Sequence, residues 1–246
     1  MTDLIIQGIN GRMGHTLVEK ISARSDCRIV AGVDQKAGQI GDIPVYASLE
    51  DLPEAKGIVI DFTSPAGTVH AAQFCAVHGM PCVLCSTGLS KEDEAVVEQA
   101  SEKVPVFRSA NMSVGINVLI ELARRATKLF DGEFDIEIVE KHHHNKLDAP
   151  SGTAITLAGD ILDRIDRKTH WTSGTTTEPD ALEIASVRRS VVPGIHTVTY
   201  ESEADVLSIT HCAKNRCGFA TGAVMAAEFV AGKKGIFSMK DLLGLE

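Results

Sequence analysis

The first half of the chain alternates short apolar segments with stretches of helical periodicity, and this alternation limits the fold more than any other feature. Strands are expected over residues 4–7, 28–33, 57–62, 81–85 and 104–107. Helices are expected over 11–23, through 69–76, and from Ser90, with Asp93 in its first turn, to about 103. Strands that are apolar throughout are buried on both faces, and their alternation with helices is typical of a parallel sheet. The pattern predicts an α/β, Rossmann-type doubly wound fold.

The second half of the chain has a different pattern of apolar and polar residues. A long amphipathic helix is expected over 114–130, then a strand over 134–139, a polar loop and a helix over 151–165. The runs 184–192, 196–202 and 206–210 alternate apolar and polar residues, as in a sheet with one wet face. The chain closes with an expected helix over 219–230 and a short segment over 239–243. These patterns predict a mixed α+β domain with an open sheet, whose uncovered face favours self-association.

Charge and hydropathy exclude two classes of partner. The chain has 24 basic and 33 acidic residues, and its basic residues form only pairs, which disfavours nucleic-acid binding. No apolar run reaches the roughly 18–20 residues that cross a bilayer, so no membrane contact is expected. The N-terminus enters Leu4-Ile5-Ile6 without the features of a signal peptide. A cytoplasmic location is therefore expected.

Three glycines follow the first expected strand and open the first expected helix: Gly8, Gly11 and Gly14. Such glycines let the backbone approach a pyrophosphate, whose charge then faces the helix N-terminus. Asn10 stands where G-x-G-x-x-G has a glycine, and the turn is expected to survive because Asn tolerates a positive φ. Asp34 lies 20 residues past Gly14, where a carboxylate can accept hydrogen bonds from a ribose. A dinucleotide site is predicted, and a glycine-rich turn that binds nothing is the alternative.

The charge near this site bears on the choice of cofactor. The Asp34 carboxylate favours NADH because it repels the 2′-phosphate of NADPH. Lys36 and Arg12 are close enough in sequence to soften that preference. The predicted cofactor is therefore NADH or NADPH.

The most informative stretch is a histidine block, residues 142–154. His142–His144 and Lys146 precede an expected helix that Ser151 can cap, with free N–H groups at Gly152 and Thr153. Imidazoles, an ammonium and a helix N-terminus together form a receptor for a small dianion and supply proton donors near neutral pH. A small-molecule dicarboxylate is the predicted partner.

Two other interpretations of the histidine block stay open. In an extended strand, His142 and His144 could share a metal ion and His143 could not, but no third ligand is evident. No metal is therefore predicted. The block could also be a solvated polar loop.

A C-x-x-C pattern lies elsewhere, at Cys82 and Cys85. No second C-x-x-C follows it, and the pair lies in an apolar run. The pattern favours buried thiols in a strand, with zinc or redox use as the alternative.

Motifs along nearly the whole chain resemble the 4-hydroxy-tetrahydrodipicolinate reductase (dihydrodipicolinate reductase) family. The block from His142 to Ala154, H-H-x-x-K-x-D-A-P-S-G-T-A, is highly specific to that family. The other matching segments are Gly8–Gly14, Ile60–Pro65, Ser86–Gly88, Ser109–Gly115 and Ile209–His211.

The resemblance implies a cofactor domain over residues 1–110 and 217–246 and a substrate domain over 111–216 that also forms a homotetramer. It implies an enzyme of lysine and diaminopimelate biosynthesis. Its substrate arises from pyruvate and aspartate semialdehyde, and its reduction, with loss of water, gives tetrahydrodipicolinate. The nicotinamide delivers hydride to the conjugated imine, and an acid protonates the accumulating negative charge.

The resemblance also implies residue roles. By position, His142 matches the family's proton donor/acceptor and Lys146 its proton donor, while His143, Gly152 and Thr153 match substrate-binding positions. The residues that match nucleotide contacts are Gly8, Ile9, Asn10, Gly11, Arg12, Met13, Asp34, Cys85, Ser86, Thr87, Ser109, Ala110, Asn111 and Met112.

Two of these nucleotide-contact segments need comment. The stretch 109–112 is expected to be a hinge for domain closure, with an ordinary strand-to-helix loop as the alternative. Cys85 replaces the family's usual glycine, and this bears on how closely the chain approaches the nicotinamide ribose.

Two rival functions remain at this stage. One is a two-domain dehydrogenase that acts on an aldehyde or a sugar, which the histidine block disfavours. The other is a non-catalytic NAD-sensing module, which would need a DNA-binding or partner-binding element that the sequence does not show.

Overall fold

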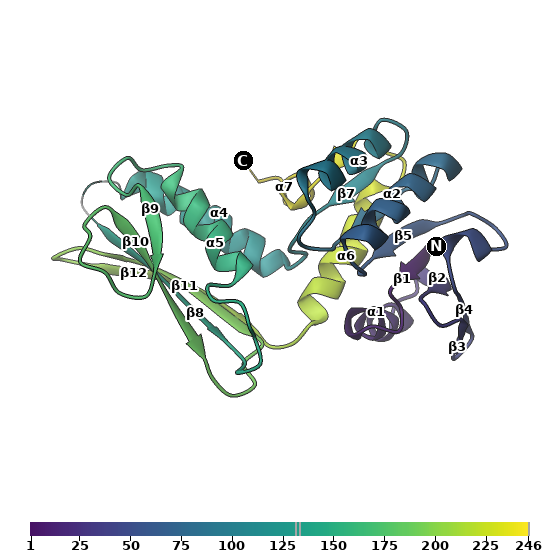
Figure 1. Cartoon of the computed structure of the whole chain (residues 1–246), viewed down its shortest axis with the longest axis horizontal. Coiled ribbons are helices and arrows are strands. Elements are labelled where there is room, and N and C mark those ends of the chain that lie inside the picture. The colour runs from purple at the N-terminus through teal and green to yellow at the C-terminus, as the bar shows by residue number, and fades with distance from the viewer. Residues whose placement is uncertain (131, 133, 246) are drawn as a thin grey trace. The chain divides into compact units, whose positions relative to one another are not determined.

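In the computed structural model, which describes residues 1–130, 132 and 134–245, the chain divides into two compact units (Figure 1). The first contains Met1–Val114 and Arg216–Glu246, and the second contains Gly115–Asn215. Residues 131, 133 and 246 fall inside the predicted domain ranges but lie outside the described residues. The assignment of the cofactor to one unit and of the substrate to the other stays a prediction.

The first unit is built on an eight-stranded sheet with the order β13-β7-β6-β5-β1-β2-β4-β3. Its strands are β1 (Thr2–Gln7), β2 (Cys27–Val33), β3 (Gly38–Ile40), β4 (Ile43–Tyr46), β5 (Ile58–Asp61), β6 (Cys82–Leu84), β7 (Val106–Arg108) and β13 (Ile236–Phe237). Neighbouring strands are parallel, apart from β3, which is antiparallel to β4. The strand order reverses between β1 and β5, and such a reversal opens a crevice at the carboxyl ends of the strands. The predicted Rossmann-type sheet is confirmed.

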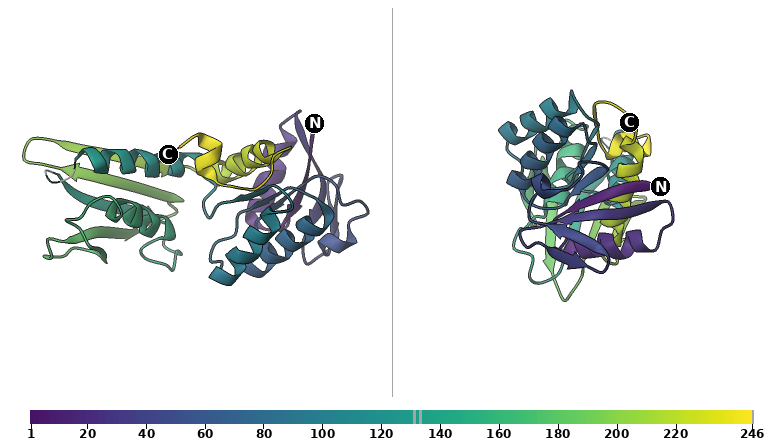
Figure 2. Two further views of the ribbon diagram at one scale, coloured as in Figure 1. Left: turned by 90° about the horizontal axis from the view of Figure 1, so that it is seen from above. Right: turned by 90° about the vertical axis from the view of Figure 1, so that its right-hand side faces the viewer.

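Helices cover both faces of this sheet (Figure 2). They are α1 (Arg12–Ser22), α2 (Pro65–His78), α3 (Lys91–Ser101), α6 (Cys217–Val230) and α7 (Met239–Leu243), with a 3-10 turn at Leu49–Asp51. Because side chains alternate along a strand, Leu4 and Ile6 of β1 pack with α1 and α6, whereas Ile5 packs with α2 and α3. The capping role expected of Ser90 is confirmed, since its hydroxyl accepts the Asp93 N–H at 3.1 Å at the start of α3.

The second unit contains a five-stranded mixed sheet with the order β12-β11-β8-β10-β9. Its elements are α4 (Val114–Leu129), β8 (Asp135–His142), α5 (Gly152–Leu162), β9 (His170–Ser173), β10 (Ala181–Arg188), β11 (Gly194–Glu201) and β12 (Val206–Ala213). Helices α4 and α5 pack on one face, where Ile138, Ile184 and Val198 form the centre of the core. The predicted second, mixed α/β unit is confirmed.

Several element boundaries differ from those expected. Strand β8 continues to His142, into the segment expected to be a loop, because β10 and β11 pair with it along that length. Strand β10 ends at Arg188, not at residue 192, because Ser190 adopts a left-handed φ of 54° that an extended strand excludes. Helix α5 ends at Leu162, three residues early. The short strands β3, β4, β9 and β13 were not expected.

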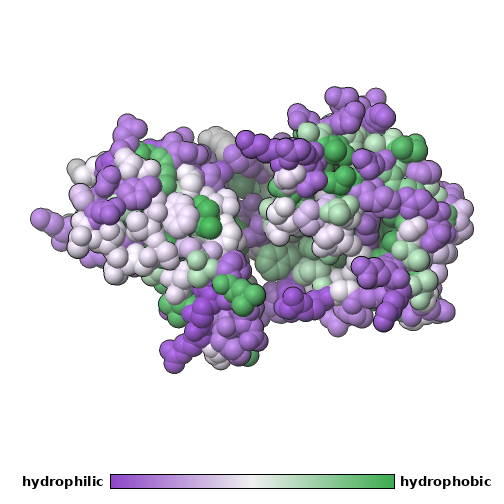
Figure 3. Space-filling model, in the orientation of Figure 1, coloured by the Kyte–Doolittle hydropathy of each residue, from purple (hydrophilic) through white to green (hydrophobic). Residues whose placement is uncertain are grey.

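No helix in the described part of the chain is long and apolar enough to cross a bilayer. The face of the molecule in Figure 3 carries hydrophilic residues over much of both units, with hydrophobic residues exposed in small groups.

Candidate active site

A cavity of about 490 Å³ lies at the carboxyl ends of β1, β2 and β5 in the first unit. This is the position at which Rossmann-type sheets bind nucleotides. Of the predicted cofactor residues, Gly8, Gly11 and Asp34 line it. Ser64 and His70 line it as well, and the sequence-based prediction missed them. The available signal was Ser64-Pro65 directly after an apolar strand, a helix-start pattern that the structure bears out in α2.

The glycine turn has the geometry that close backbone approach requires. Gly8 has a φ of +84°, and a Cβ atom there would lie 3.1 Å from the Phe62 carbonyl oxygen. A Cβ on Gly14 would lie 2.2 Å from the Ile9 carbonyl oxygen, so only glycine lets α1 start against this turn. The left-handed residue is thus Gly8, and Asn10 is not among the residues with positive φ. The turn therefore does not need a glycine at residue 10.

Asp34 ties the second strand to the turn. Its Oδ2 accepts the Asn10 backbone N–H at 2.9 Å, and its Oδ1 accepts the Gln35 N–H at 2.8 Å. The side-chain amide of Asn10 donates to the Lys36 carbonyl oxygen at 3.3 Å. A carboxylate has about four acceptor sites, so Asp34 retains capacity for ribose hydroxyls.

The side chain of Asp61, at the end of β5, is fully buried and contacts one predicted cofactor residue, Ser86. It accepts hydrogen bonds from the Thr63 N–H at 3.1 Å, from the Ser86 hydroxyl at 3.2 Å and from the hydroxyls of Thr63 and Thr68. Burial raises the pKa of Asp61, and the hydrogen bonds from Thr63, Thr68 and Ser86 oppose that rise. Sequence reasoning missed this residue, although a carboxylate at the end of a wholly apolar strand is itself a signal.

The other predicted cofactor segments follow β6 and β7. Cys85 is buried, and its backbone N–H donates to the Asp61 carbonyl oxygen at 3.0 Å. In the second segment, the Ser109 hydroxyl donates to the Asn111 carbonyl oxygen at 2.9 Å. Backbone contacts therefore organise both segments.

Cys82 and Cys85 belong to the hydrophobic clusters on opposite faces of the sheet, and both are free thiols. Burial raises the pKa of the Cys85 thiol. The two sulfur atoms cannot share a metal ion or a disulfide, so the interpretation as buried thiols is confirmed.

These features fit a dinucleotide. The first turn of α1 contains no acidic residue, and its N-cap, Gly11, leaves the free N–H groups without a side-chain partner. Such a helix end attracts a pyrophosphate. The cavity, the left-handed glycine and the Asp34 carboxylate supply the remaining parts of the site.

In the second unit, His142 ends β8 and lies half-buried on the helix-covered face of the sheet. Its Nδ1 lies 3.1 Å from the Pro193 carbonyl oxygen, and its Nε2 lies 3.1 Å from Oε2 of Glu140. Because a carbonyl only accepts hydrogen bonds, Nδ1 carries a proton and Nε2 is the atom that titrates.

Glu140 is a completely buried carboxylate two residues before His142. Its Oε1 accepts a hydrogen bond from Nη2 of Arg188 at 2.7 Å. The same nitrogen donates to the Asp148 carbonyl oxygen at 2.5 Å, which ties β10 to the segment after β8.

His196 on β11 packs beside His142, with their ring centroids 5.2 Å apart. Its Nε2 lies 3.1 Å from the hydroxyl of Ser151, which caps α5 by accepting the Ala154 N–H at 3.3 Å. Burial lowers the pKa of His196 to about 4, so the ring is neutral at pH 7 and shares a hydrogen bond with the Ser151 hydroxyl.

The remaining residues of the histidine block surround the start of α5. Lys146 pairs with Asp148 at 2.8 Å, and His143 is half-buried. Gly152 and Thr153 form the first turn of α5. His144 is exposed, and its Nδ1 lies 2.8 Å from the Ser190 carbonyl oxygen.

Glu140, His142 and His196 bring ligand-type atoms to within 4.8 Å of one another, a spacing that a metal ion could use. This set of ligands differs from the His142 and His144 pair considered from the sequence. Strand β8 ends at His142, and the His144 ring contacts the Ser190 carbonyl oxygen instead. The Arg188 guanidinium already supplies the positive charge that a buried carboxylate needs. The cluster therefore has the character of a charge and proton network.

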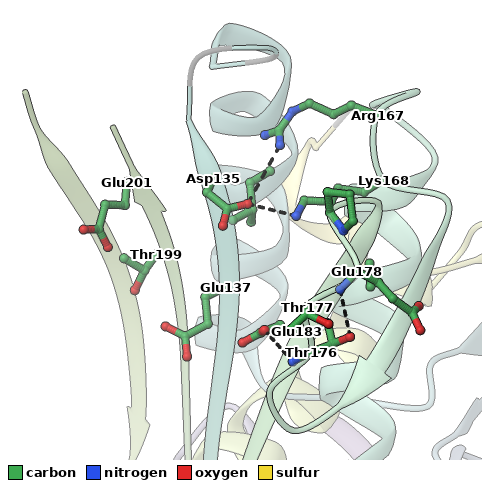
Figure 4. A pocket seen from close by; sticks show the side chains of 13 residues that line it. Asp135, Glu137, Arg167, Lys168, Thr176, Thr177, Glu178, Glu183, Thr199 and Glu201 are labelled. Carbon is green, nitrogen blue, oxygen red and sulfur yellow. Dashed lines mark hydrogen bonds and ion pairs between the residues drawn. The ribbon is translucent and has the colours of Figure 1, made fainter. Parts of the chain in front are cut away.

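A larger cavity, of about 630 Å³, lies at the Asp135 end of β8 (Figure 4). His142 is at the other end of that strand. Asp135 contacts Lys168 at 2.9 Å and Arg167 at 3.9 Å, and Oε1 of Glu183 accepts the Thr176 N–H at 2.8 Å. Asp135, Arg167 and Lys168 are thus paired with one another. Four further acids also line the cavity, Glu137, Glu178, Glu183 and Glu201, and none of the predicted site residues does.

One unit has a crevice that fits a dinucleotide, and the other has imidazoles and an ammonium at a helix N-terminus. These are features of the class of two-domain nucleotide-dependent oxidoreductases. The family model "Dihydrodipicolinate reductase, N-terminus" matches residues 2–112, and "Dihydrodipicolinate reductase, C-terminus" matches residues 115–243. The chain belongs to the dihydrodipicolinate reductase family. It is a pyridine-nucleotide-dependent oxidoreductase of lysine and diaminopimelate biosynthesis.

Relatives support this assignment over the whole chain. The 4-hydroxy-tetrahydrodipicolinate reductase of Caldanaerobacter subterraneus subsp. tengcongensis is 41% identical over 99% of this chain and 98% of its own length. The enzyme of the same name from Anaeromyxobacter sp. is 39% identical over 100% of this chain and 98% of its own.

Two solved structures share the fold. A dipicolinate-bound dihydrodipicolinate reductase from Paenisporosarcina sp. TG-14 has a TM-score of 0.84 at 24% identity and covers 97% of each chain. D-galactose-1-dehydrogenase from Rhizobium etli has a TM-score of 0.61 at 14% identity, over 99% of this chain and 94% of its own. The likeness to a sugar dehydrogenase is therefore one of fold alone.

Proposed function

We propose that this chain reduces 4-hydroxy-tetrahydrodipicolinate to tetrahydrodipicolinate, with NADH or NADPH as the hydride source. The observation that carries the proposal is the cluster of His142, His143 and Lys146 beside the capped N-terminus of α5. The net charge of the chain is -9, so a dianion needs such a local concentration of positive charge and N–H donors. The relative from Paenisporosarcina binds dipicolinate, a ring that carries two carboxylates.

In this proposal, the N–H groups of Gly152 and Thr153 bind one substrate carboxylate. Ser151 accepts the Ala154 N–H and so fixes the start of the helix beside the histidine block. His143 and Lys146 bind the dianion from the preceding segment. Asp148 holds the Lys146 ammonium near α5 until the substrate competes for it.

His142 and Lys146 supply the acid chemistry. Lys146 donates a proton as negative charge accumulates on the ring, and His142 acts as proton donor/acceptor and holds positive charge nearby. The bound dihydronicotinamide supplies the hydride. The residues of the first unit position it: Gly8–Met13 at the pyrophosphate, Asp34 at the ribose, and 85–87 and 109–112 at the nicotinamide end.

NADH and NADPH are both accepted in this proposal. The Asp34 carboxylate disfavours a 2′-phosphate, and Lys36 and Arg12 offset part of that repulsion. We also propose that residues 109–112 act as the hinge of a domain closure and that the chain forms a cytoplasmic homotetramer.

The test follows the absorbance of NADH and of NADPH with the freshly made condensation product of pyruvate and aspartate semialdehyde. Substrate-dependent oxidation of either cofactor is expected, and no oxidation of either would refute the proposal.

Variants test the residue roles. His142→Ala and Lys146→Ala are each expected to lower kcat by roughly 10²–10⁴ while NADH affinity stays nearly unchanged, because general acid catalysis contributes about that much. Full activity in both variants would contradict the acid chemistry.

A further inference from the structure

We propose that Glu140 is a positioning residue that fixes the His142 ring and opposes the loss of its proton for the reduction. The inference rests on the proposed function, because it assigns a charge state to a residue of that reaction. Glu140 was not among the predicted site residues. It becomes visible only because β8 continues to His142, which places both side chains on one face of the sheet.

The first argument is the arrangement of acceptors around the ring. Nδ1 of His142 faces the Pro193 carbonyl oxygen, and Nε2 faces Oε2 of Glu140, each at 3.1 Å. The two atoms at 3.1 Å do not meet the geometry of a hydrogen bond, so Glu140 acts on the ring through its charge. A carboxylate this close favours the imidazolium over the neutral ring.

The second argument is that Glu140 itself stays ionised. Although burial raises the pKa of Glu140, the hydrogen bond from Arg188 brings it below the ordinary value. Arg188 is held in turn by the Asp148 carbonyl oxygen at 2.5 Å. The carboxylate is therefore a fixed negative charge beside His142.

The third argument is that the ring has little freedom. A Cβ atom on Gly194 would lie 2.9 Å from Cε1 of His142, so a glycine there allows the close approach of β11. The His196 ring packs against His142 at an interplanar angle of 74°. The His142 side chain is only 12% exposed.

The charges around His142 come from four strands and one loop. The pKa of His142 lies below its usual value, because burial, Lys146 and Arg188 together lower it by more than Glu140 and the Pro193 carbonyl raise it. His196 is neutral at pH 7, and His211 lies opposite His196 on β12. Removing the Glu140 charge should therefore make His142 lose its proton at a lower pH.

The wild-type protein provides a test that needs no change at Glu140. In ¹⁵N NMR of histidine-labelled protein, with the His142 signals assigned by their loss in His142→Gln, Nδ1 is expected to stay protonated while Nε2 titrates. A neutral ring with its proton on Nε2 and a bare Nδ1 would overturn the proposal.

Kinetics provide the second test. Because the reaction uses protonated His142, kcat should fall on the alkaline side as that proton is lost. Glu140→Gln is expected to move the midpoint of this fall to lower pH by about one unit or more. The matched control is Glu121→Gln, which removes another buried carboxylate of this unit, paired with Arg125 at 2.7 Å, and should leave the midpoint unchanged.

A conservative variant separates charge from shape. Glu140→Asp keeps the charge and should bring the midpoint back toward that of the wild type. If wild-type enzyme turns over but Glu140→Gln folds and keeps the wild-type midpoint, the role of Glu140 is refuted and the proposed function stands. If wild-type enzyme does not oxidise either cofactor, the proposed function itself fails.

Discussion

At the scale of single residues, burial determines which groups of the second unit carry charge. His196 is 4% exposed, and this burial lowers its pKa to about 4 from a usual 6.5. The hydrogen bond between the neutral ring and the Ser151 hydroxyl helps to hold the start of α5. A buried imidazole thus contributes to the site through its uncharged form.

The buried His196 should make the second unit sensitive to acid. Between pH 6.5 and pH 4 the unfolded chain binds a proton that folded His196 does not, so the free energy of unfolding falls as the pH is lowered. The loss from this residue is about 2 kcal/mol between pH 6.5 and 5. Urea unfolding followed by the fluorescence of Trp171, the single tryptophan and a residue of β9, measures it. His196→Gln should show a smaller pH dependence, and an unchanged one would contradict the assignment.

The carboxylate of Asp34 should set the cofactor preference. Asp34→Asn removes the repulsion of a 2′-phosphate, so the ratio of kcat/KM for NADPH to that for NADH should rise on the order of tenfold. Initial rates with both cofactors measure this ratio. Asp42→Asn, at an exposed acid between β3 and β4, serves as the control for net charge. An equal rise in both variants, or none in Asp34→Asn, would count against the role of Asp34.

At the scale of elements, the start of α5 links stability to binding. The Ser151 hydroxyl both caps the helix and contacts His196, so it fixes the donors that the proposal assigns to a substrate carboxylate. A cap of this kind stabilises a helix by about 1 kcal/mol.

Ser151→Ala should therefore lower the free energy of unfolding by about 1 kcal/mol and also raise the substrate KM. Ser90→Ala removes the cap of α3 in the other unit. It should cost a similar free energy and leave the KM unchanged. Steady-state kinetics and urea unfolding of both variants give the comparison, and an unchanged KM in Ser151→Ala would separate the cap from the site.

Elements also show what the sequence could predict. The strands of the first sheet were predictable because both of their faces are buried, so that their residues are almost all apolar. In β5 (Ile58–Asp61), for example, only the last residue is polar. The glycine turn and Asp34 were predictable because they are close in sequence to such strands. Short strands such as β3 were not, since three residues carry too little periodicity.

The proton network was beyond prediction from the sequence. Glu140, Arg188 and His196 meet because β8 pairs with both β10 and β11 in a particular register. That register is a long-range property, and a local pattern does not encode it. The alternation of Ile136, Ile138 and Glu140 was the only local sign that a carboxylate occupies a core position.

At the scale of the whole molecule, the uncovered face of the second sheet is relevant to oligomerisation. Side chains such as Thr197 and Thr210, whose hydroxyls lie 3.0 Å apart, point away from the face that α4 and α5 cover. Val206, which lies on β12 with Thr210, is 61% exposed. An uncovered sheet of this kind is suited to pairing with copies of itself.

Sedimentation should therefore detect a tetramer in the wild type. Thr210→Glu places a charge on the uncovered face and should shift the protein toward smaller species. Val77→Glu, at an exposed position on α2, is the control and should remain tetrameric. A monomeric wild type would contradict this account of the sheet.

The central claim is that the histidine and lysine cluster at the start of α5 binds a dianionic ring. Calorimetric titration of the NADH-bound protein with dipicolinate tests it most directly. The wild type should bind dipicolinate, and Lys146→Ala should bind it roughly 10- to 100-fold more weakly, because a charged hydrogen bond is lost, while its NADH affinity stays the same. Equal dipicolinate affinity in the two proteins would contradict the claim.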